Sequence, residues 1–207
     1  QDQGVDYLGV ACSDEGVELR KSGVSLPILV LNVEPESFRS CILNNLEPAI
    51  YSFSQLDLFI RELIYMKRGS HPIHIKFDTG MHRLGFESND VSKVIQMVQA
   101  QPEVYIKSVF SHLADASGAD KTFSNQQVEI FNKIKKEFVS SQTGSILFHL
   151  LNTDGIVNFP EAQHEMVRLG IGMYGITSSK RDQNKLEPVF SWQTKISQIK
   201  NIKKGDI

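Results

Sequence analysis

The sequence predicts an α/β fold of the (β/α)8 barrel type, incomplete at its N-terminus. Short apolar runs alternate with segments of helical periodicity along most of the chain, and the connections between them are short. Such alternation is typical of a parallel sheet whose strands are joined by helices. Seven runs have strand character, whereas a complete barrel has eight strands and usually takes about 250 residues. We therefore expect residues 1–177 to form a partial barrel.

The expected elements follow one another in a regular order. The strands cover residues 7–11, 27–32, 49–53, 73–78, 106–111, 147–152 and 167–169, and the helices cover 14–21, 36–44, 54–67, 89–100 and 124–138. The first helix begins with acidic residues and ends with basic residues before Gly23, which suits the helix dipole and a glycine cap. Ser54 and Asn89 occupy expected N-cap positions. In the last helix, Val128 and Phe131 begin an apolar stripe that predicts a core-facing side.

The pattern changes after Tyr174. Residues 178–187 are polar and are expected to form a linker. Residues 188–207 contain an alternating stretch over 189–202, which predicts the first strand of a truncated second domain of β type. The chain starts at Gln1 next to a strand-like run and ends just after another. We therefore expect it to be a fragment of a longer protein.

Composition excludes several classes of function. The formal net charge of −2 gives no electrostatic basis for binding nucleic acid or an anionic membrane. No apolar run is long enough to span a bilayer, and no export leader is recognisable. The two cysteines, Cys12 and Cys41, fit no metal-binding spacing and no disulfide framework. We expect both to be reduced and buried in a cytoplasmic protein without a metal site.

The segment from His74 to Phe86 is the most informative part of the chain. Side chains alternate along a strand, so Ile75 and Phe77 would face one side, and His74, Lys76 and Asp78 the other. Charged groups on a core strand are costly unless they are paired or face a site. Arg83 follows and can return a planar donor to the strand end. The simpler interpretation is a solvated charge pair on a surface strand.

This segment resembles the signature of bacterial alanine racemases, which runs lysine-x-aspartate-threonine-glycine-methionine-x-arginine-leucine-glycine. These are pyridoxal-phosphate enzymes built on a barrel of alternating strands and helices. Three further segments resemble the same family in the same order, namely residues 111–116, 149–153 and 166–175. The likeness covers the chain from Val5 to its last residue. In such barrels the working residues lie at the C-terminal ends of the strands.

The resemblance implies a binding site for pyridoxal 5'-phosphate. Gly170 and Ile171 would donate backbone N–H groups to the phosphate, and Thr153 a hydroxyl where the family commonly has serine. Asn152 would support them from the adjacent position. Arg168 would face the pyridine nitrogen, and because arginine keeps its proton it would act only as a donor. The alternative for Arg168 is a structural arginine paired with a carboxylate such as Glu165.

The resemblance also assigns residues on the substrate side. Arg83 would orient the substrate carboxylate, and Lys76 would hold Arg83. Two adjacent cations repel, which carbamylation of Lys76, common in the family, would resolve. His112 would lie beside the ring and bond toward Arg168; otherwise it is a core histidine with satisfied hydrogen bonds. The family's Schiff-base lysine motif and its second base, a tyrosine of the β domain, do not occur in this chain.

The expected function is that of a portion of an alanine racemase. The parent would interconvert L-alanine and D-alanine for peptidoglycan synthesis as a homodimer, and this fragment would be inactive without both bases. Two alternatives remain, a racemase of another small amino acid and a catalytically inactive barrel module of a fusion protein. The flanking sequence of the full-length gene would distinguish them.

Overall fold

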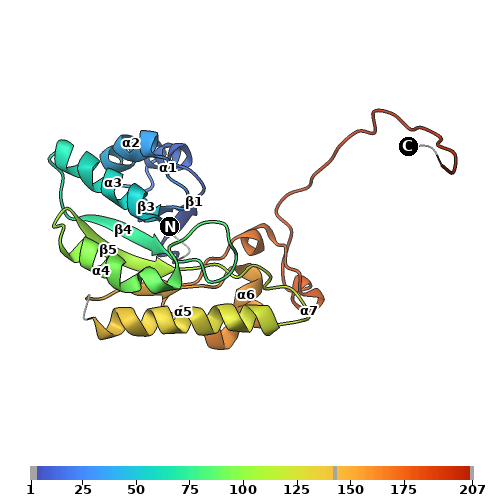
Figure 1. Cartoon of the computed structure of the whole chain (residues 1–207). Helices are drawn as coiled ribbons and strands as arrows, with labels where there is room; N and C mark the ends of the chain where they lie inside the picture. The colour runs from blue at the N-terminus through green and yellow to red at the C-terminus, as the bar shows by residue number, and fades with distance from the viewer. Residues whose placement is uncertain (1–3, 142–143, 206–207) are drawn as a thin grey trace.

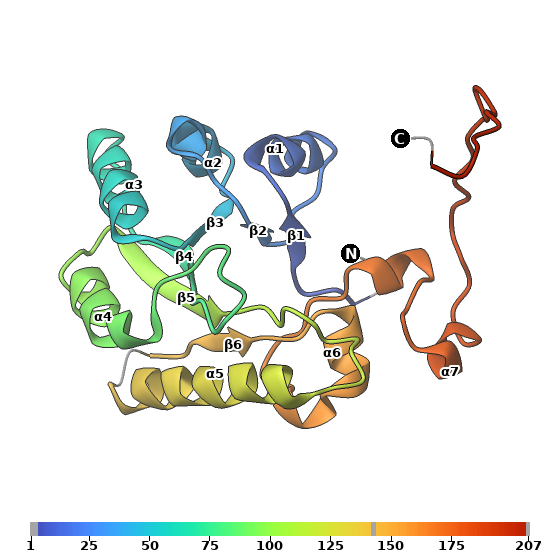
Figure 2. The ribbon, with the colours of Figure 1, turned by 45° about the vertical axis from the view of Figure 1, so that its right-hand side comes forward.

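The computed structural model describes residues 4–141 and 144–205. Six parallel strands form one sheet in sequential order. They are β1 (Leu8–Val10), β2 (Ile28–Val30), β3 (Glu47–Ile50), β4 (His71–Lys76), β5 (Val104–Phe110) and β6 (Leu147–His149). Because each new strand is added on the same side of the previous one, the sheet curls continuously in one direction. Figure 2 shows the resulting half-barrel, which confirms the predicted fold class, incomplete barrel included.

Five helices cover the outer, convex face of this sheet (Figure 1). They are α1 (Ser13–Lys21), α2 (Phe38–Leu43), α3 (Phe53–Tyr65), α4 (Val91–Gln99) and α5 (Thr122–Ser140). The predicted N-cap at Ser54 is wrong, because the extended residue before α3 is Ser52, whose side chain accepts a hydrogen bond from the Gln55 N–H. Asn89 is not a cap either. It lies inside the short 3₁₀ turn η2 (Ser88–Asp90), which Glu87 caps.

The two faces of the sheet carry two separate apolar clusters. The larger cluster fills the space between the outer face and the helices, and includes Ile75, Phe77 and the α5 residue Phe131. The smaller cluster lies on the opposite, inner face and is formed by Leu29, Ala49 and Phe110, with Tyr7 and Leu31 packed against it. Alternation along the strands places these residues on the side that a barrel encloses.

One cysteine prediction holds and the other does not. Cys41 is buried as predicted. Cys12 is exposed because it lies at the N-cap of α1, in the connection that follows β1 at the edge of the sheet. Both are free thiols. No helix among residues 4–141 and 144–205 is long and apolar enough to cross a membrane.

The chain after β6 differs most from the sequence-based expectation. It contains α6 (Thr153–Asn158), the 3₁₀ turns η3 (Pro160–Ala162) and η4 (Ile171–Tyr174), and α7 (Lys180–Gln183), which lies in the expected linker. The strand predicted over 167–169 is wrong. Among the described residues, two backbone hydrogen bonds join this stretch to β6 and the residues after it, from the Met166 N–H to the Phe148 carbonyl and from the Arg168 N–H to the Leu151 carbonyl. Two bonds with an uneven register make no strand ladder.

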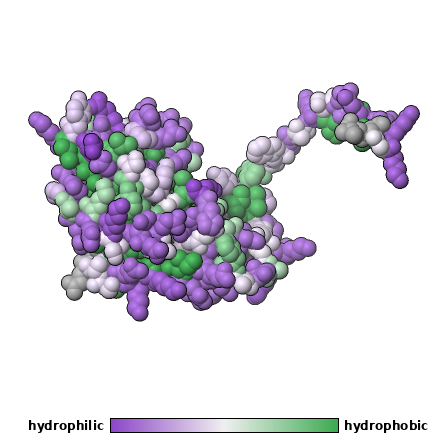
Figure 3. Space-filling view, viewed as in Figure 1, coloured by the Kyte–Doolittle hydropathy of each residue, from purple (hydrophilic) through white to green (hydrophobic). Residues whose placement is uncertain are grey.

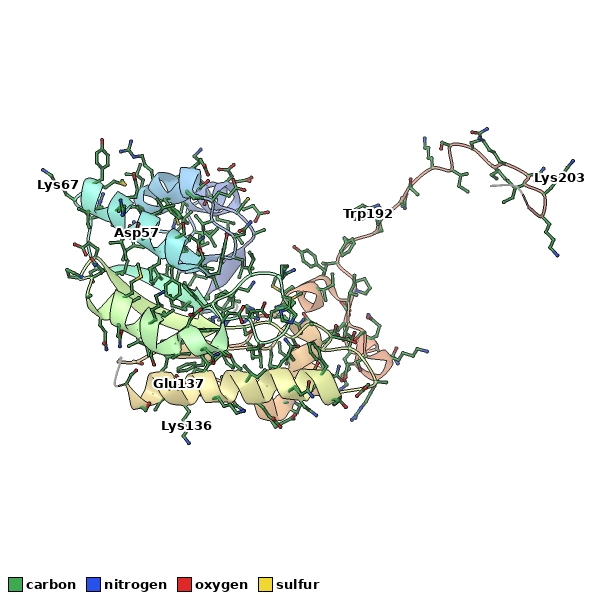
Figure 4. All side chains as sticks on the ribbon, in the orientation of Figure 1. Asp57, Lys67, Lys136, Glu137, Trp192 and Lys203 are labelled. Atoms are coloured by element: carbon green, nitrogen blue, oxygen red, sulfur yellow. The ribbon has the colours of Figure 1, made fainter. Side chains whose placement is uncertain are left out.

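Residues 188–205 extend away from the folded body. Figures 1 and 4 show this arm leaving the half-barrel, with Trp192 and Lys203 far from the sheet, and Figure 3 shows apolar side chains along it. Trp192 is 89% exposed. The strand predicted over 189–202 is not formed, because a strand needs a neighbour to accept its hydrogen bonds. The last two residues of the predicted 188–207 segment lie outside the described residues, and the β domain stays a prediction.

Candidate functional site

Three strands end side by side at the carboxyl edge of the sheet. Lys76 ends β4, Phe110 ends β5 and His149 ends β6, and the parallel register pairs Lys76 with Phe110 and Phe110 with His149. Their side chains lie on the inner face. The His149 ring stacks on Phe110 with centroids 4.8 Å apart. The Lys76 ammonium lies 5.9 Å and the Arg168 guanidinium 5.4 Å from the centre of the Phe110 ring. Phe110 is therefore the centre of the candidate site.

Arg168 joins the ends of β5 and β6. Its Nη2 donates to the carbonyls of Ser111 at 2.7 Å and Leu150 at 2.9 Å. Its Nη1 donates to the ring Nδ1 and the carbonyl of His149. Burial lowers the pKa of Arg168 to about 10, which leaves it charged at neutral pH. The alternative pairing with Glu165 is not formed, because Glu165 bonds Lys135 at 2.7 Å instead.

His112 contacts Arg168 as the resemblance implied. The Nη2 of Arg168 lies 3.3 Å from the Nδ1 of His112. Burial, followed by the charges of Arg168, Arg83 and Lys76, lowers the pKa of His112 to about 4. The imidazole is therefore neutral at pH 7, and its Nδ1 can accept a hydrogen bond from the guanidinium. This contact is present, while the catalytic role of His112 stays a prediction.

Lys76 is a buried cation close to other cations. Only 8% of the residue is exposed. Burial, with the charges of Arg83 and Arg168, lowers the pKa of Lys76 to about 8, although Asp78 acts in the opposite direction. Asp78 is engaged elsewhere, since its Oδ1 accepts the N–H groups of Gly80 and His82. Lys76 therefore has a substantial neutral fraction in mildly alkaline solution.

Lys76 and Arg83 interact through their charges, without a hydrogen bond between them among the described residues. Arg83 is exposed, and within the described ranges the Asp78 carboxylate accepts from Gly80 and His82 and not from Arg83. Its charge nevertheless acts on Lys76. The physical reason is that two cations repel when no anion lies between them. The roles assigned to Lys76 and Arg83 stay predictions.

Replacing Lys76 with methionine is expected to stabilise the protein by about 2–3 kcal/mol at pH 7, because it removes a cation that burial and neighbouring charges disfavour. The pKa is lower in the folded state, about 8, than its ordinary value of 10.5. The unfolded chain therefore binds more protons between these values, and wild-type stability rises with pH across that window. The advantage of the variant should shrink from pH 8 and vanish above pH 10.5. Urea denaturation at pH 7, 9 and 10.5 measures it, and a pH-independent difference would contradict the assignment.

Thr153 organises the loop that follows Arg168. Its Oγ1 accepts the N–H groups of Gly170 and Gly172, both at 3.1 Å. A Cβ on Gly172 would lie 2.9 Å from the Thr153 methyl carbon, so the loop passes close to this side chain. Asn152 caps α6 by accepting the Gly155 N–H at 2.9 Å. The Gly170 N–H, for which the resemblance implied a phosphate, thus points at Thr153. Among the described residues the Ile171 N–H has no hydrogen-bond partner.

Sequence reasoning missed several polar residues of the inner face. Glu47 at the start of β3 and Ser108 in β5 hydrogen-bond to His74, and Tyr7 hydrogen-bonds to Glu47. Their alternation with apolar residues is the signal that could have placed them on the inner side. In the part of the chain that the structure describes, no cluster of three or more histidine, cysteine or acidic side chains could hold a metal ion.

Relatives of known name share both the sequence and the fold. Alanine racemases from a Nostoc species and from Clostridium tetani are 33% and 34% identical over 98% and 99% of this chain. A solved alanine racemase from Clostridium difficile in complex with cycloserine superposes with a TM-score of 0.84 at 28% identity, over 90% of this chain and 52% of its own. One from the D-cycloserine producer Streptomyces lavendulae gives 0.83 at 25%, over 91% and 51%.

The match covers nearly all of this chain but only part of each relative. This chain spans about half the length of the relatives, 54% of each of the two sequences above. The family model described as "Alanine racemase, N-terminal domain" matches residues 1–178, which contain all six strands of the half-barrel and the loop after Arg168. With its curled parallel sheet and its polar strand ends, the chain belongs to the alanine racemase family and corresponds to its N-terminal domain.

Proposed function

We propose that this chain is the cofactor-binding portion of a pyridoxal-phosphate-dependent alanine racemase. The parent protein would interconvert L-alanine and D-alanine in the cytoplasm as a homodimer and supply D-alanine for peptidoglycan. The observation that carries the proposal is the position of Arg168. It lies at the carboxyl edge of a family-matching half-barrel, fixed by carbonyl groups and bonded to no carboxylate among the described residues.

The residues present fit the two polar ends of pyridoxal phosphate. The two Nη atoms of Arg168 serve protein acceptors, and within the described chain its Nε–H has no hydrogen-bond partner. That N–H is a donor for a pyridine nitrogen. At the other end, the Thr153 hydroxyl and the Ile171 N–H are donors for a phosphate, since the hydroxyl can donate while it accepts from Gly170 and Gly172.

The chain's own residues would bind and orient the reactants. Bound pyridoxal phosphate supplies an electron-withdrawing ring that acidifies the α-proton of an attached amino acid. Arg168 would donate to the ring nitrogen without transferring its proton, which limits how far negative charge spreads into the ring. His112, neutral beside Arg168, would fix the position of the guanidinium. The positive charges of Lys76 and Arg83 would attract the substrate carboxylate.

Proton removal and return would need groups that match no motif of this chain. Racemisation requires a base on each side of the α-carbon. The family's lysine and tyrosine motifs do not occur among these 207 residues. We therefore propose that the polypeptide alone is inactive and that the half-barrel becomes active only when joined to segments that carry both bases.

A segment exchange tests this proposal. The chain alone with added pyridoxal phosphate is expected to form no D-alanine from L-alanine. A chimera in which residues 5–177 replace the corresponding part of the Clostridium tetani alanine racemase is expected to form it at an enzymatic rate. The matched controls are chimeras with Arg168→Ala, expected to lose activity, and with Arg61→Ala on the exposed face of α3, expected to retain it.

Three outcomes would count against the proposal. Turnover by the chain alone would show that it contains its own bases. A folded chimera that racemises another amino acid in preference to alanine would favour the alternative substrate. A folded chimera that binds pyridoxal phosphate but racemises no amino acid would favour the inactive module.

A further inference from the structure

A continuous line of hydrogen bonds crosses the inner face of the half-barrel from Arg168 to Tyr7, the residue before β1. Arg168 bonds the Nδ1 of His149, and the Nε2 of His149 lies 2.9 Å from the Ser108 hydroxyl. That hydroxyl lies 2.6 Å from the Nδ1 of His74, whose Nε2 lies 2.8 Å from a carboxylate oxygen of Glu47. The Tyr7 hydroxyl donates to the same oxygen at 2.8 Å. We call these six residues the inner-face relay.

The strand register explains why the inner-face relay is continuous. His74 on β4 is the direct partner of Ser108 on β5. Glu47 lies two residues before Ala49, the partner of His74 on β3, and His149 lies two residues after Leu147, the partner of Ser108 on β6. Offsets of two residues keep all these side chains on one face. His74, Ser108 and His149 are completely buried, so water does not compete for their bonds.

The charge of Glu47 determines which atoms of the inner-face relay donate and which accept. Burial opposes the charged carboxylate, but the hydrogen bonds from His74 and Tyr7 prevail and lower the pKa of Glu47. Burial, followed by the Glu47 hydrogen bond, raises the pKa of Tyr7. An ionised carboxylate only accepts hydrogen bonds, so both Tyr7 and the Nε2 of His74 must donate to it.

The positions of the protons on His74 and Ser108 follow from the ionised state of Glu47. Burial lowers the pKa of His74 despite the neighbouring carboxylate, so its imidazole is neutral and its contact with Glu47 is a hydrogen bond rather than an ion pair. A neutral imidazole with its proton on Nε2 can only accept at Nδ1. The Ser108 hydroxyl must therefore donate to His74, and its oxygen is left to accept from the Nε2 of His149.

The ring proton of His149 is the last one to assign in the inner-face relay. Burial, with the charge of Arg168, lowers its pKa well below the ordinary value, so it also carries one ring proton. If that proton is on Nε2, then Nδ1 holds a lone pair directed at the Arg168 Nη1. The opposite tautomer would place a ring N–H against a guanidinium N–H, so Arg168 would lose this acceptor and the contact that holds its Nη1 in this orientation.

We propose that Glu47, four side chains away from Arg168 along the inner-face relay, is a positioning residue that fixes the tautomers of His74 and His149 and thereby the orientation of Arg168. The functional consequence for Arg168 rests on the proposed function, whereas the tautomer assignment does not. Glu47 acts only through the side chains between them, because its carboxylate contacts His74 and Tyr7 and not Arg168.

Nitrogen NMR of the histidine rings tests the proposal without cofactor or turnover. In the full chain labelled with ¹⁵N-histidine, His74 and His149 are each expected as a single neutral tautomer with the proton on Nε2. Glu47→Leu removes the acceptor, and both rings are expected to lose this fixed state and show shifted, mixed signals. Ser108→Ala cuts the inner-face relay in the middle, so His149 is expected to shift while His74 keeps its tautomer.

The variants also include controls. Glu47→Gln keeps an acceptor oxygen and is expected to retain the wild-type tautomers. Glu62→Leu removes a carboxylate on α3 that bonds Arg39, outside the inner-face relay, and is expected to change neither ring. A wild-type His149 with its proton on Nδ1 would overturn the proposal. Unchanged tautomers in the folded Glu47→Leu and Ser108→Ala proteins would overturn it too. Because these readouts need no pyridoxal phosphate, their failure is distinguishable from failure of the segment exchange.

Discussion

Replacing Gly85 with alanine is expected to lower the free energy of unfolding by at least about 3 kcal/mol. Gly85 has φ +147°, a conformation that residues with a side chain rarely adopt. A Cβ at this position would lie 2.3 Å from the Asp78 nitrogen and 2.5 Å from the Phe77 carbonyl carbon. Both are backbone atoms of the chain that continues β4, so neither can move away as a flexible side chain could.

The Gly85→Ala substitution would also disturb the candidate site, because Phe86 connects Gly85 to the end of β4. Its N–H donates to the Lys76 carbonyl and its carbonyl accepts the Asp78 N–H, both at 2.9 Å. Its ring packs edge-on against Phe53 at 4.9 Å. If the backbone separates at Gly85, these contacts loosen together, and the end of β4 that carries Lys76 loses its support.

Chemical denaturation of both proteins measures the effect. The matched control is Gly69→Ala, since Gly69 lies in a surface connection, has no positive φ and would place its Cβ with nothing within 4 Å. Its expected change is within about 0.5 kcal/mol, or a slight stabilisation. Equal effects at Gly69 and Gly85 would show that the close approach at Gly85 does not contribute to stability.

Periodic patterns in the sequence predicted the half-barrel well. The apolar runs of β1 to β6 and the stripe containing Phe131 on α5 are local features, because each follows from the repeat of one strand or helix. The predictions over 167–169 and 189–202 failed because a strand is defined by its neighbour. Residue alternation contains no information about whether that neighbour is present.

The candidate site was predictable only in part. The resemblance placed Arg168, His112 and Thr153 in one region, and the structure brings His112 to Arg168 and Thr153 to the loop that follows Arg168. It did not show that backbone carbonyl groups bind Arg168. Every residue has a carbonyl, so a sequence does not indicate which ones accept from a given side chain. The predicted third strand began at residue 49, two positions after the true start at Glu47. Glu47, the acceptor of the inner-face relay, was therefore not placed on any strand, because element boundaries are the least certain part of such predictions.

Replacing Arg168 with alanine is expected to have an effect as large as that at Gly85, about 3–5 kcal/mol of lost stability. The guanidinium satisfies the carbonyls of Ser111, His149 and Leu150, which lie at or just beyond the ends of two strands. Truncation would leave the Ser111 and Leu150 carbonyls without this donor, while the His149 carbonyl would keep its bond from the Ser111 N–H. Hydrogen bonds to a charged group contribute about 1.5–3 kcal/mol each. Their non-additivity keeps the total below the simple sum.

A lysine at position 168 separates charge from geometry. Arg168→Lys keeps the positive charge but offers a single ammonium in place of a planar fork, so it can reach fewer of the three carbonyls. Its expected loss of stability is about half that of Arg168→Ala. The control is Arg61→Ala, whose side chain is 72% exposed and pairs with Asp57 on the surface of α3, with an expected change within about 0.5 kcal/mol.

Urea denaturation and amide hydrogen exchange together distinguish a local role from a general one. In Arg168→Ala, exchange is expected to accelerate most at the carboxyl ends of β5 and β6, where the Ser111 N–H is bonded to the His149 carbonyl. β1 and β2 lie at the other edge of the sheet and should respond only through global stability. If Arg168→Ala were no more destabilising than Arg61→Ala, the guanidinium would not hold these strand ends together. Its fixed position, on which both the cofactor assignment and the role of Glu47 depend, would then lack a physical cause.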